Sequence, residues 1–180
     1  MDSSCLIVSD DKIVDIVDDM YIGIDPGING AIACVTGDDM FTIPCPKTIL
    51  DMANTVDQLV EIHEHTGYRI HAIIEAVHSF PGNSAKSMFT FGMNYGQWLG
   101  ILASSMIPYT QVTPTVWIKH YGSMPKERTA RKNHLKHLAQ QRYPKHRVTL
   151  KTADAILLAE YCRYNAIVSN SYTPQLSYKI

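Results

Sequence analysis

The sequence predicts one α/β domain in which helices flank a mixed, five-stranded β-sheet. Apolar strand-like segments come first, helical and strand-like segments then alternate, and no repeat or low-complexity tract divides the chain. That order is typical of a sheet covered by helices. The chain has 180 residues, 46% of them hydrophobic, so it is long enough to bury one core. No apolar run approaches the roughly 18 residues of a membrane span, so we expect none.

Strand character is clearest in the segments YIGID and AIACVTG, which flank the turn DPGING. Pro26 fixes φ in this turn, while Gly27 and Gly30 permit backbone conformations that other residues resist. The two segments therefore predict a hairpin. All predicted strands together span residues 21–25, 31–37, 40–44, 71–76 and 107–112. The predicted helices span residues 48–66, 84–104, 126–142 and 151–165, as judged from their apolar periodicity.

The ends of the chain are predicted to be appended to this core, which spans residues 20–166. Residues 1–19 contain six aspartates beside the apolar segments LIV and KIVDIV. This composition is compatible with a flexible acidic arm and also with an added strand or hairpin. Residues 167–180 are predicted to form a C-terminal tail.

Charge is distributed unevenly along the chain, although the formal net charge is only −1. Residues 1–66 contain 13 acidic and 2 basic side chains, whereas residues 119–151 contain ten basic side chains and one acidic one. Such a basic segment indicates a surface for a polyanion, and a solvated basic helix is the alternative. The candidate contacts to such a polyanion in this segment are Lys119, Lys126, Arg128, Arg131, Lys132, Lys136 and Lys151.

The cysteines and the N-terminus indicate the kind of cellular compartment in which the protein works. Cys5, Cys34, Cys45 and Cys162 form no C-x-x-C pair, which argues against a zinc ribbon and a disulfide framework. The N-terminus lacks the basic start of a secretory signal. We therefore expect a reducing compartment, either the cytoplasm of a bacterial or phage-infected cell, or an organelle or nucleus in a eukaryote.

Three carboxylates are candidates for a metal-dependent active site. Asp25 and Glu75 follow the apolar strands YIGI and HAII, and Asp154 lies at the start of the last helix. A charge at the end of a buried strand is costly unless it is compensated. Carboxylates from two strands and a helix can hold Mg²⁺ for hydrolysis of a phosphodiester. The alternatives are a turn former at Asp25, an arginine partner for Glu75 and a favourable helix-start acid at Asp154.

The segments around these acids resemble those of the RuvC-type Holliday-junction resolvases, and divergent phage-like members in particular. YIGIDPGINGAIA is similar to the segment with the first catalytic acid, IIEAVHSFPGNSAKSMFTFGMNYGQWLGIL to that with the second, and TADAILLAEY to the last-helix motif. The resemblance runs from about Met20 to Tyr164. It implies an RNase H-like fold, a homodimer, dependence on Mg²⁺ or Mn²⁺, and paired nicking of four-way DNA junctions by two-metal catalysis at Asp25, Glu75 and Asp154.

The chain departs from the family pattern at Lys151, where typical members have an acid or a histidine. Lysine cannot bind Mg²⁺, which leaves three possibilities. Lys151 contacts the scissile phosphate as a point charge, or Asp154 and the substrate phosphate suffice to hold the second ion, or catalysis is weak. His78 stands where the family often has an aromatic residue that touches a base, and it is either a DNA contact or a structural cap. Phe89 and Phe91 are candidates for insertion between unstacked bases, with core packing as the alternative.

The small residues of the helix at 84–104, which recur about every four positions, predict a helix–helix contact in a dimer or within one subunit. Two alternative functions share the same acids: a nuclease for branched DNA in general, and a junction-binding protein with weak cleavage. A sugar-kinase-like ATPase also contains D-x-G-x-x-G hairpins, but it needs two domains, and 180 residues supply one.

Overall fold

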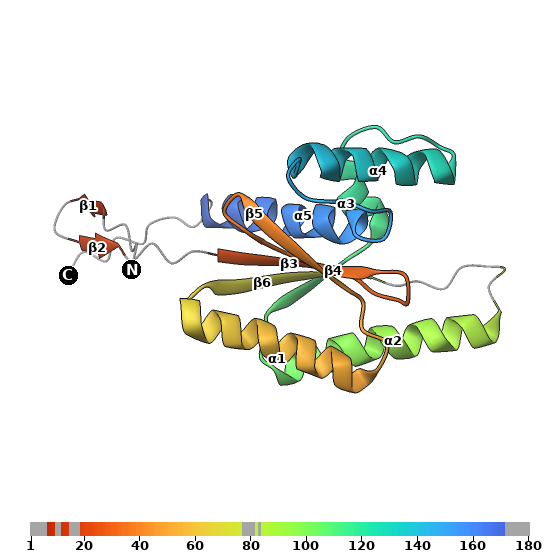
Figure 1. The fold of residues 1–180 in the computed structure, drawn as a ribbon, viewed down its shortest axis with the longest axis horizontal. Coiled ribbons are helices and arrows are strands. Elements are labelled where there is room, and N and C mark those ends of the chain that lie inside the picture. Colours follow the sequence, from red (N-terminus) through yellow and green to blue (C-terminus); the bar gives the residue numbers. More distant parts are fainter. Residues whose placement is uncertain (1–6, 10–11, 15–18, 77–81, 83, 172–180) are drawn as a thin grey trace.

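The computed structural model describes residues 7–9, 12–14, 19–76, 82 and 84–171 of the chain (Figure 1). Its centre is a five-stranded sheet with the strand order β5-β4-β3-β6-β7. The strands are β3 (Asp19–Asp25), β4 (Ala31–Thr36), β5 (Asp39–Pro44), β6 (Arg69–Glu75) and β7 (Tyr109–Val112). β3, β4 and β5 form an antiparallel meander, while β6 and β7 run parallel to β3. The predicted mixed five-stranded sheet is confirmed.

Helices cover both faces of the sheet. On one face lie α1 (Ile49–Thr66) and α2 (Ala85–Ser104), and on the other lie α3 (Pro114–His120), α4 (Arg128–Arg142) and α5 (Ala153–Ser171) (Figure 1). Residues of β3 alternate between the two cores: Ile22 and Ile24 pack with α1 and α2, whereas Tyr21 packs with α5. The central strands are apolar on both faces for this reason.

The predicted elements agree with the observed ones except in three places. The structure contains a short helix, α3, that the sequence did not predict, and α5 extends to Ser171 beyond the predicted end at residue 165. Two further short strands, β1 (Ile7–Ser9) and β2 (Lys12–Val14), pair antiparallel. They lie within residues 1–19, whose composition is compatible with either a flexible arm or an added strand or hairpin. The described cysteines Cys34, Cys45 and Cys162 are free and buried, and Cys5 lies outside the described residues.

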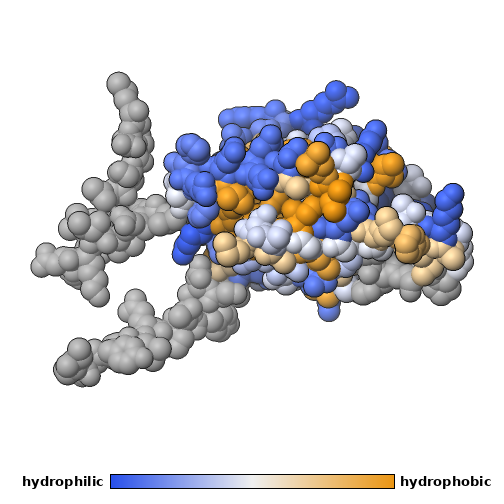
Figure 2. All heavy atoms as spheres, turned by 90° about the horizontal axis from the view of Figure 1, so that it is seen from below, coloured by the Kyte–Doolittle hydropathy of each residue, from blue (hydrophilic) through white to orange (hydrophobic). Residues whose placement is uncertain are grey.

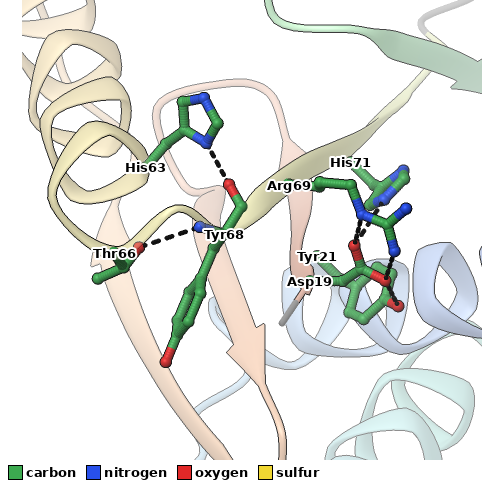
Figure 3. Close-up of polar contacts among 7 residues, drawn as sticks. All are labelled: Asp19, Tyr21, His63, Thr66, Tyr68, Arg69 and His71. Atoms are coloured by element: carbon green, nitrogen blue, oxygen red, sulfur yellow. Dashed lines mark hydrogen bonds and ion pairs between the residues drawn. The ribbon is translucent and has the colours of Figure 1, made fainter. Parts of the chain in front are cut away.

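Polar contacts fix the amino-terminal ends of β3 and β6 to each other. Asp19 accepts hydrogen bonds from Arg69 Nε at 2.8 Å and from the Tyr21 hydroxyl at 3.0 Å, and His71 Nε2 lies 3.2 Å from it (Figure 3). At the preceding turn, α1 ends at Gly67, whose φ of 73° places it in the left-handed region. These contacts hold the parallel pair in register at the end opposite to its carboxyl termini.

None of the described helices combines the length and the apolar character that crossing a bilayer requires.

Candidate active site

Asp25 and Glu75 end two neighbouring parallel strands at the same level. Ile24 of β3 pairs with Ile74 of β6, so the next residue of each strand is one of the two acids. Both side chains are partly buried. Parallel strands present their carboxyl ends at one edge of a sheet, which is where α/β proteins commonly bind ligands. The structure therefore brings the first two predicted acids to one place.

Asp154 joins them because α5 packs unusually close to β3. A Cβ atom at Gly23 would stand 2.2 Å from the carbonyl oxygen of Ala155 and 2.3 Å from the amide nitrogen of Ala159. Only glycine permits this approach, which sets the first turn of α5 beside the end of β3. Asp154 lies in that first turn and its side chain is buried.

A second glycine shapes the loop that follows Asp25. A Cβ at Gly30 would lie 1.9 Å from the Asp25 carbonyl oxygen, so Gly30 is required for space. Gly27 has a φ of 116°, a conformation that glycine alone adopts readily. Thus the DPGING turn closes tightly around the backbone of Asp25, as its residue types predicted.

The electrostatics of the site are those of crowded carboxylates. Burial, together with the charges of Glu75 and Asp154, raises the pKa of Asp25 to about 8, although Lys132 opposes the shift. Burial and the charge of Asp154 also raise the pKa of Glu75. Negative charge from the neighbouring carboxylates therefore makes ionisation of Asp25 and of Glu75 less favourable, which is the condition that a bound cation would relieve.

Lys132 of α4 is the cation that the structure places in this site. Its ammonium group forms an ion pair with Asp154 Oδ2. The charges of Asp154, Asp25 and Glu75 raise the pKa of Lys132 even though burial alone would lower it. The sequence predicted Lys132 only as one of several phosphate contacts on a helix face, and its contact with a catalytic candidate was not foreseen.

The three carboxylates fit a divalent ion in their chemistry. The other carboxylate oxygen of Asp154, Oδ1, is buried and has no hydrogen-bond partner within the described part of the chain. Hard oxygen ligands of this kind suit Mg²⁺. Within the residues that the structure describes, no three acidic, histidine or cysteine side chains are already gathered as metal ligands. Binding would therefore require the carboxylates to turn toward a common ion and Lys132 to leave Asp154.

Trp117 of α3 is a residue of the site that sequence reasoning missed. It is fully buried, and its indole Nε1 donates a hydrogen bond of 2.7 Å to Glu75 Oε2. This hydrogen bond favours the ionised form and opposes the raised pKa of Glu75. An indole N–H only donates, so a buried tryptophan needs an acceptor, but no acidic residue lies near Trp117 in the sequence to indicate which one.

The other predicted site residues are spread around this end of the molecule and over α4. Lys151 is exposed in the turn before α5, where the described residues give it no ion pair. Phe89 and Phe91, 69% and 38% exposed, lie in the first turns of α2. His78 lies outside the described residues. Basic side chains that are exposed or partly exposed on α3, α4 and the loop between them are Lys119, Lys126, Arg128, Arg131 and Lys136.

Solved structures show which fold this is. The structure of T. thermophilus RuvC in complex with a Holliday junction substrate matches with a TM-score of 0.55 and 13% identity, over 83% of this chain and 96% of that one. The chain has the RNase H-like fold of RuvC. A second Thermus thermophilus RuvC structure matches with a TM-score of 0.54, again at 13% identity over 83% of this chain and 96% of that one.

A third match is the yeast mitochondrial Holliday junction resolvase Ydc2, with a TM-score of 0.45 and 15% identity, over 86% of this chain and 82% of that one. No family model matches the chain, and no curated protein matches it significantly. The likeness to RuvC is therefore one of fold.

Proposed function

We propose that the chain is a Mg²⁺-dependent endonuclease that resolves four-way DNA junctions by paired, symmetric nicks. The observation that carries this proposal is the set of three carboxylates, Asp25, Glu75 and Asp154, whose charges act on one another at one edge of an RNase H-like sheet. The match to a RuvC structure that holds a Holliday junction supports the choice of substrate.

In this proposal the three acids hold one or two Mg²⁺ ions, with Mn²⁺ as a substitute. Divalent ions bound there would supply an activated water and stabilise the leaving oxygen. Trp117 keeps Glu75 oriented through its hydrogen bond. Lys132, once released from Asp154, and Lys151 would act as point charges for substrate phosphates. The basic side chains of α3 and α4 supply further backbone contacts, whose strength falls with salt.

A homodimer would supply the second active site that paired nicking needs. One face of α2 supports this assembly. Gly92, Gly96 and Gly100 are exposed, and a Cβ at any of them would meet no atom within 4 Å. Phe89 and Met93 are exposed on the same face of the helix. Figure 2 looks at the side formed by α1 and α2 and shows hydrophobic side chains gathered there inside a hydrophilic rim.

A junction-binding protein with weak cleavage is the second candidate. Two observations favour it: a lysine, Lys151, occupies the position of a usual metal ligand, and the ammonium of Lys132 already neutralises Asp154. In that case the basic surface would bind branched DNA, and the acids would bind metal too weakly for rapid hydrolysis.

One experiment separates these functions. The protein is incubated with a labelled four-way junction and with a linear duplex of the same sequence, in Mg²⁺ or in EDTA. Symmetric nicks in the junction alone, only with Mg²⁺, support the resolvase. Cutting of both substrates supports a broader nuclease, and tight binding without cutting supports the binding protein. Glu75→Gln should abolish cutting and leave junction binding intact, and normal cutting by this variant would contradict the metal assignment.

A further inference from the structure

A pocket of about 510 Å³ opens directly beside the loop that follows Asp25. Its walls come from that loop, from the segment after β5 and from the first three turns of α2. Phe91 joins the pocket to the active-site loop, because a Cβ at Gly27 would lie 3.1 Å from the Phe91 ring. The volume falls within the range of about 300–1,000 Å³ that is usual for small-molecule sites, so one nucleotide can be accommodated.

The charges of this pocket are opposite to those of the three carboxylates. Lys47 and Lys86 line it, and no acidic side chain does. Neither lysine forms an ion pair within the described residues. Lys86 lies in the first turn of α2, where the helix dipole disfavours a positive charge. Two exposed ammonium groups that have no acidic partner in the described part of the chain therefore favour an anionic ligand.

The remaining walls suit a nucleoside better than a bare anion. Phe91 and Ile28, 38% and 75% exposed, present apolar surface to the pocket. Asn94 also lines it, and its Oδ1 atom is buried with no hydrogen-bond partner in the described part of the molecule. A buried acceptor without a donor is costly, so rotation of the Asn94 amide toward an N–H group of a bound base would relieve this cost.

The position of the pocket on α2 keeps it open in the proposed dimer. Phe91, Asn94 and Trp98 follow one another at intervals of three and four, so they share a helix face. Trp98 on that face is fully buried in the core between α2 and the sheet. Gly92 and Gly96 lie on the opposite face, where the dimer contact is proposed. The pocket therefore faces the active-site loop and not the partner subunit.

We infer that this pocket binds one nucleotide of the DNA strand next to the scissile phosphate, with its phosphate on Lys47 and Lys86 and its base against Phe91. The inference rests on the proposed function and extends it, because it assigns a strand-positioning role to residues outside the three acids. Base packing on an aromatic ring tolerates any sequence, whereas the amide of Asn94 favours bases that offer it a donor.

The test measures binding to junctions in which single phosphates are replaced by uncharged methylphosphonates. Binding is followed by fluorescence anisotropy in Ca²⁺, so cleavage does not intervene. The wild type is compared with Lys47→Gln/Lys86→Gln and with Asn54→Asp/Gln58→Glu, a control with the same charge change at exposed positions of α1. Circular dichroism establishes that both variants are folded.

For the wild type and the control we expect weaker binding when one or two phosphates beside the cut are neutralised. The double lysine variant should bind the unmodified junction more weakly than the wild type does. The methylphosphonate replacements should not lower its affinity further. Its salt dependence should be shallower by about 1 in the slope of log K against log salt, since the one phosphate held by both lysines contributes about 0.9. Phe91→Leu should remove the cost of an abasic substitution at the same nucleotide.

Three results would overturn the inference. The same methylphosphonate profile in the wild type and the lysine variant would show that the pocket holds no strand phosphate, while leaving the nuclease proposal in place. Binding of free thymidine monophosphate that requires both lysines, without any effect on junction binding, would assign the pocket to a free nucleotide. Failure of the wild type to bind any junction would remove the proposed function as well.

Discussion

Replacing Asp25 with asparagine should abolish cleavage and, at the same time, make the metal-free protein more stable at neutral pH. Folding raises the pKa of Asp25 from 3.8 to about 8, through burial and the charges of Glu75 and Asp154. In the unfolded chain this carboxyl group is ionised above about pH 4, but in the folded protein it holds its proton until about pH 8. The wild type should therefore lose stability as the pH rises between these two values.

The magnitude follows from the interval over which the two states differ. At pH 7 that interval is 7 minus 3.8, roughly 3 pKa units, and each unit corresponds to about 1.36 kcal/mol. The partly buried Asp25 carboxyl group thus destabilises the folded wild type at pH 7 by at most about 4 kcal/mol. Because the Asp25 side chain is partly exposed, solvent screens part of this free energy. We expect Asp25→Asn to raise the free energy of unfolding by about 1–3 kcal/mol at pH 7.

The assay is urea unfolding in EDTA, at about pH 5 and about pH 8, of the wild type, Asp25→Asn and the control Asp57→Asn. Asp57 is exposed on α1, and its replacement should change little. The advantage of Asp25→Asn should grow from the lower to the higher pH. Added Mg²⁺ should stabilise the wild type, since a ligand of the native state does so by mass action, and should leave Asp25→Asn unchanged. A variant no more stable than the wild type at both pH values would refute the buried, crowded environment of Asp25.

Three further substitutions test other parts of the structure. Gly23→Ala should lower the free energy of unfolding by about 3 kcal/mol or more in urea, because its Cβ would meet the α5 backbone at 2.2 Å; a neutral effect would contradict the close packing that positions Asp154. Trp117→Phe should slow junction cleavage about tenfold and shift the acidic limb of the pH–rate profile upward, because the lost hydrogen bond holds the pKa of Glu75 down; an unchanged profile would show that the indole does not act on Glu75. Asp19→Asn should lower stability by about 1–2 kcal/mol near neutral pH. Burial alone would raise the pKa of Asp19, but hydrogen bonds from Arg69, Tyr21 and His71 lower it. Thermal melts of the wild type and Asp19→Asn should therefore converge as the pH falls below 3.8. A stability difference that persists there would show that the ionised form of Asp19 is not the source of the stabilisation.

The sheet was predictable from sequence because its strands are short apolar runs that end in turn residues. Asp25 and Glu75 were found by the same logic, since each is a charge at the end of such a run. The register that sets them side by side, Ile24 beside Ile74, is a tertiary property that no local pattern contains. The helix α3 was missed because seven residues are too few for an apolar periodicity to be seen.

The partners of the acids were the least predictable part of the site. Lys132 reaches Asp154 only because α4 packs beside α5, and Trp117 reaches Glu75 from α3. Both contacts join residues more than twenty positions apart. Lys151, by contrast, was singled out by its place one turn before Asp154, and its role stays a prediction. Local spacing identified the candidate ligands, whereas the groups that tune them depend on how the helices pack.

The proposed nuclease activity depends on Asp25, Glu75 and Asp154 binding a divalent ion together. The most direct measurement is the anomalous scattering of Mn²⁺ in crystals of the protein grown or soaked with that ion. We expect Mn²⁺ in contact with Asp25 and with at least one of the other two acids, and Lys132 displaced from Asp154. Mn²⁺ bound only elsewhere, with the pair between Lys132 and Asp154 intact, would contradict it.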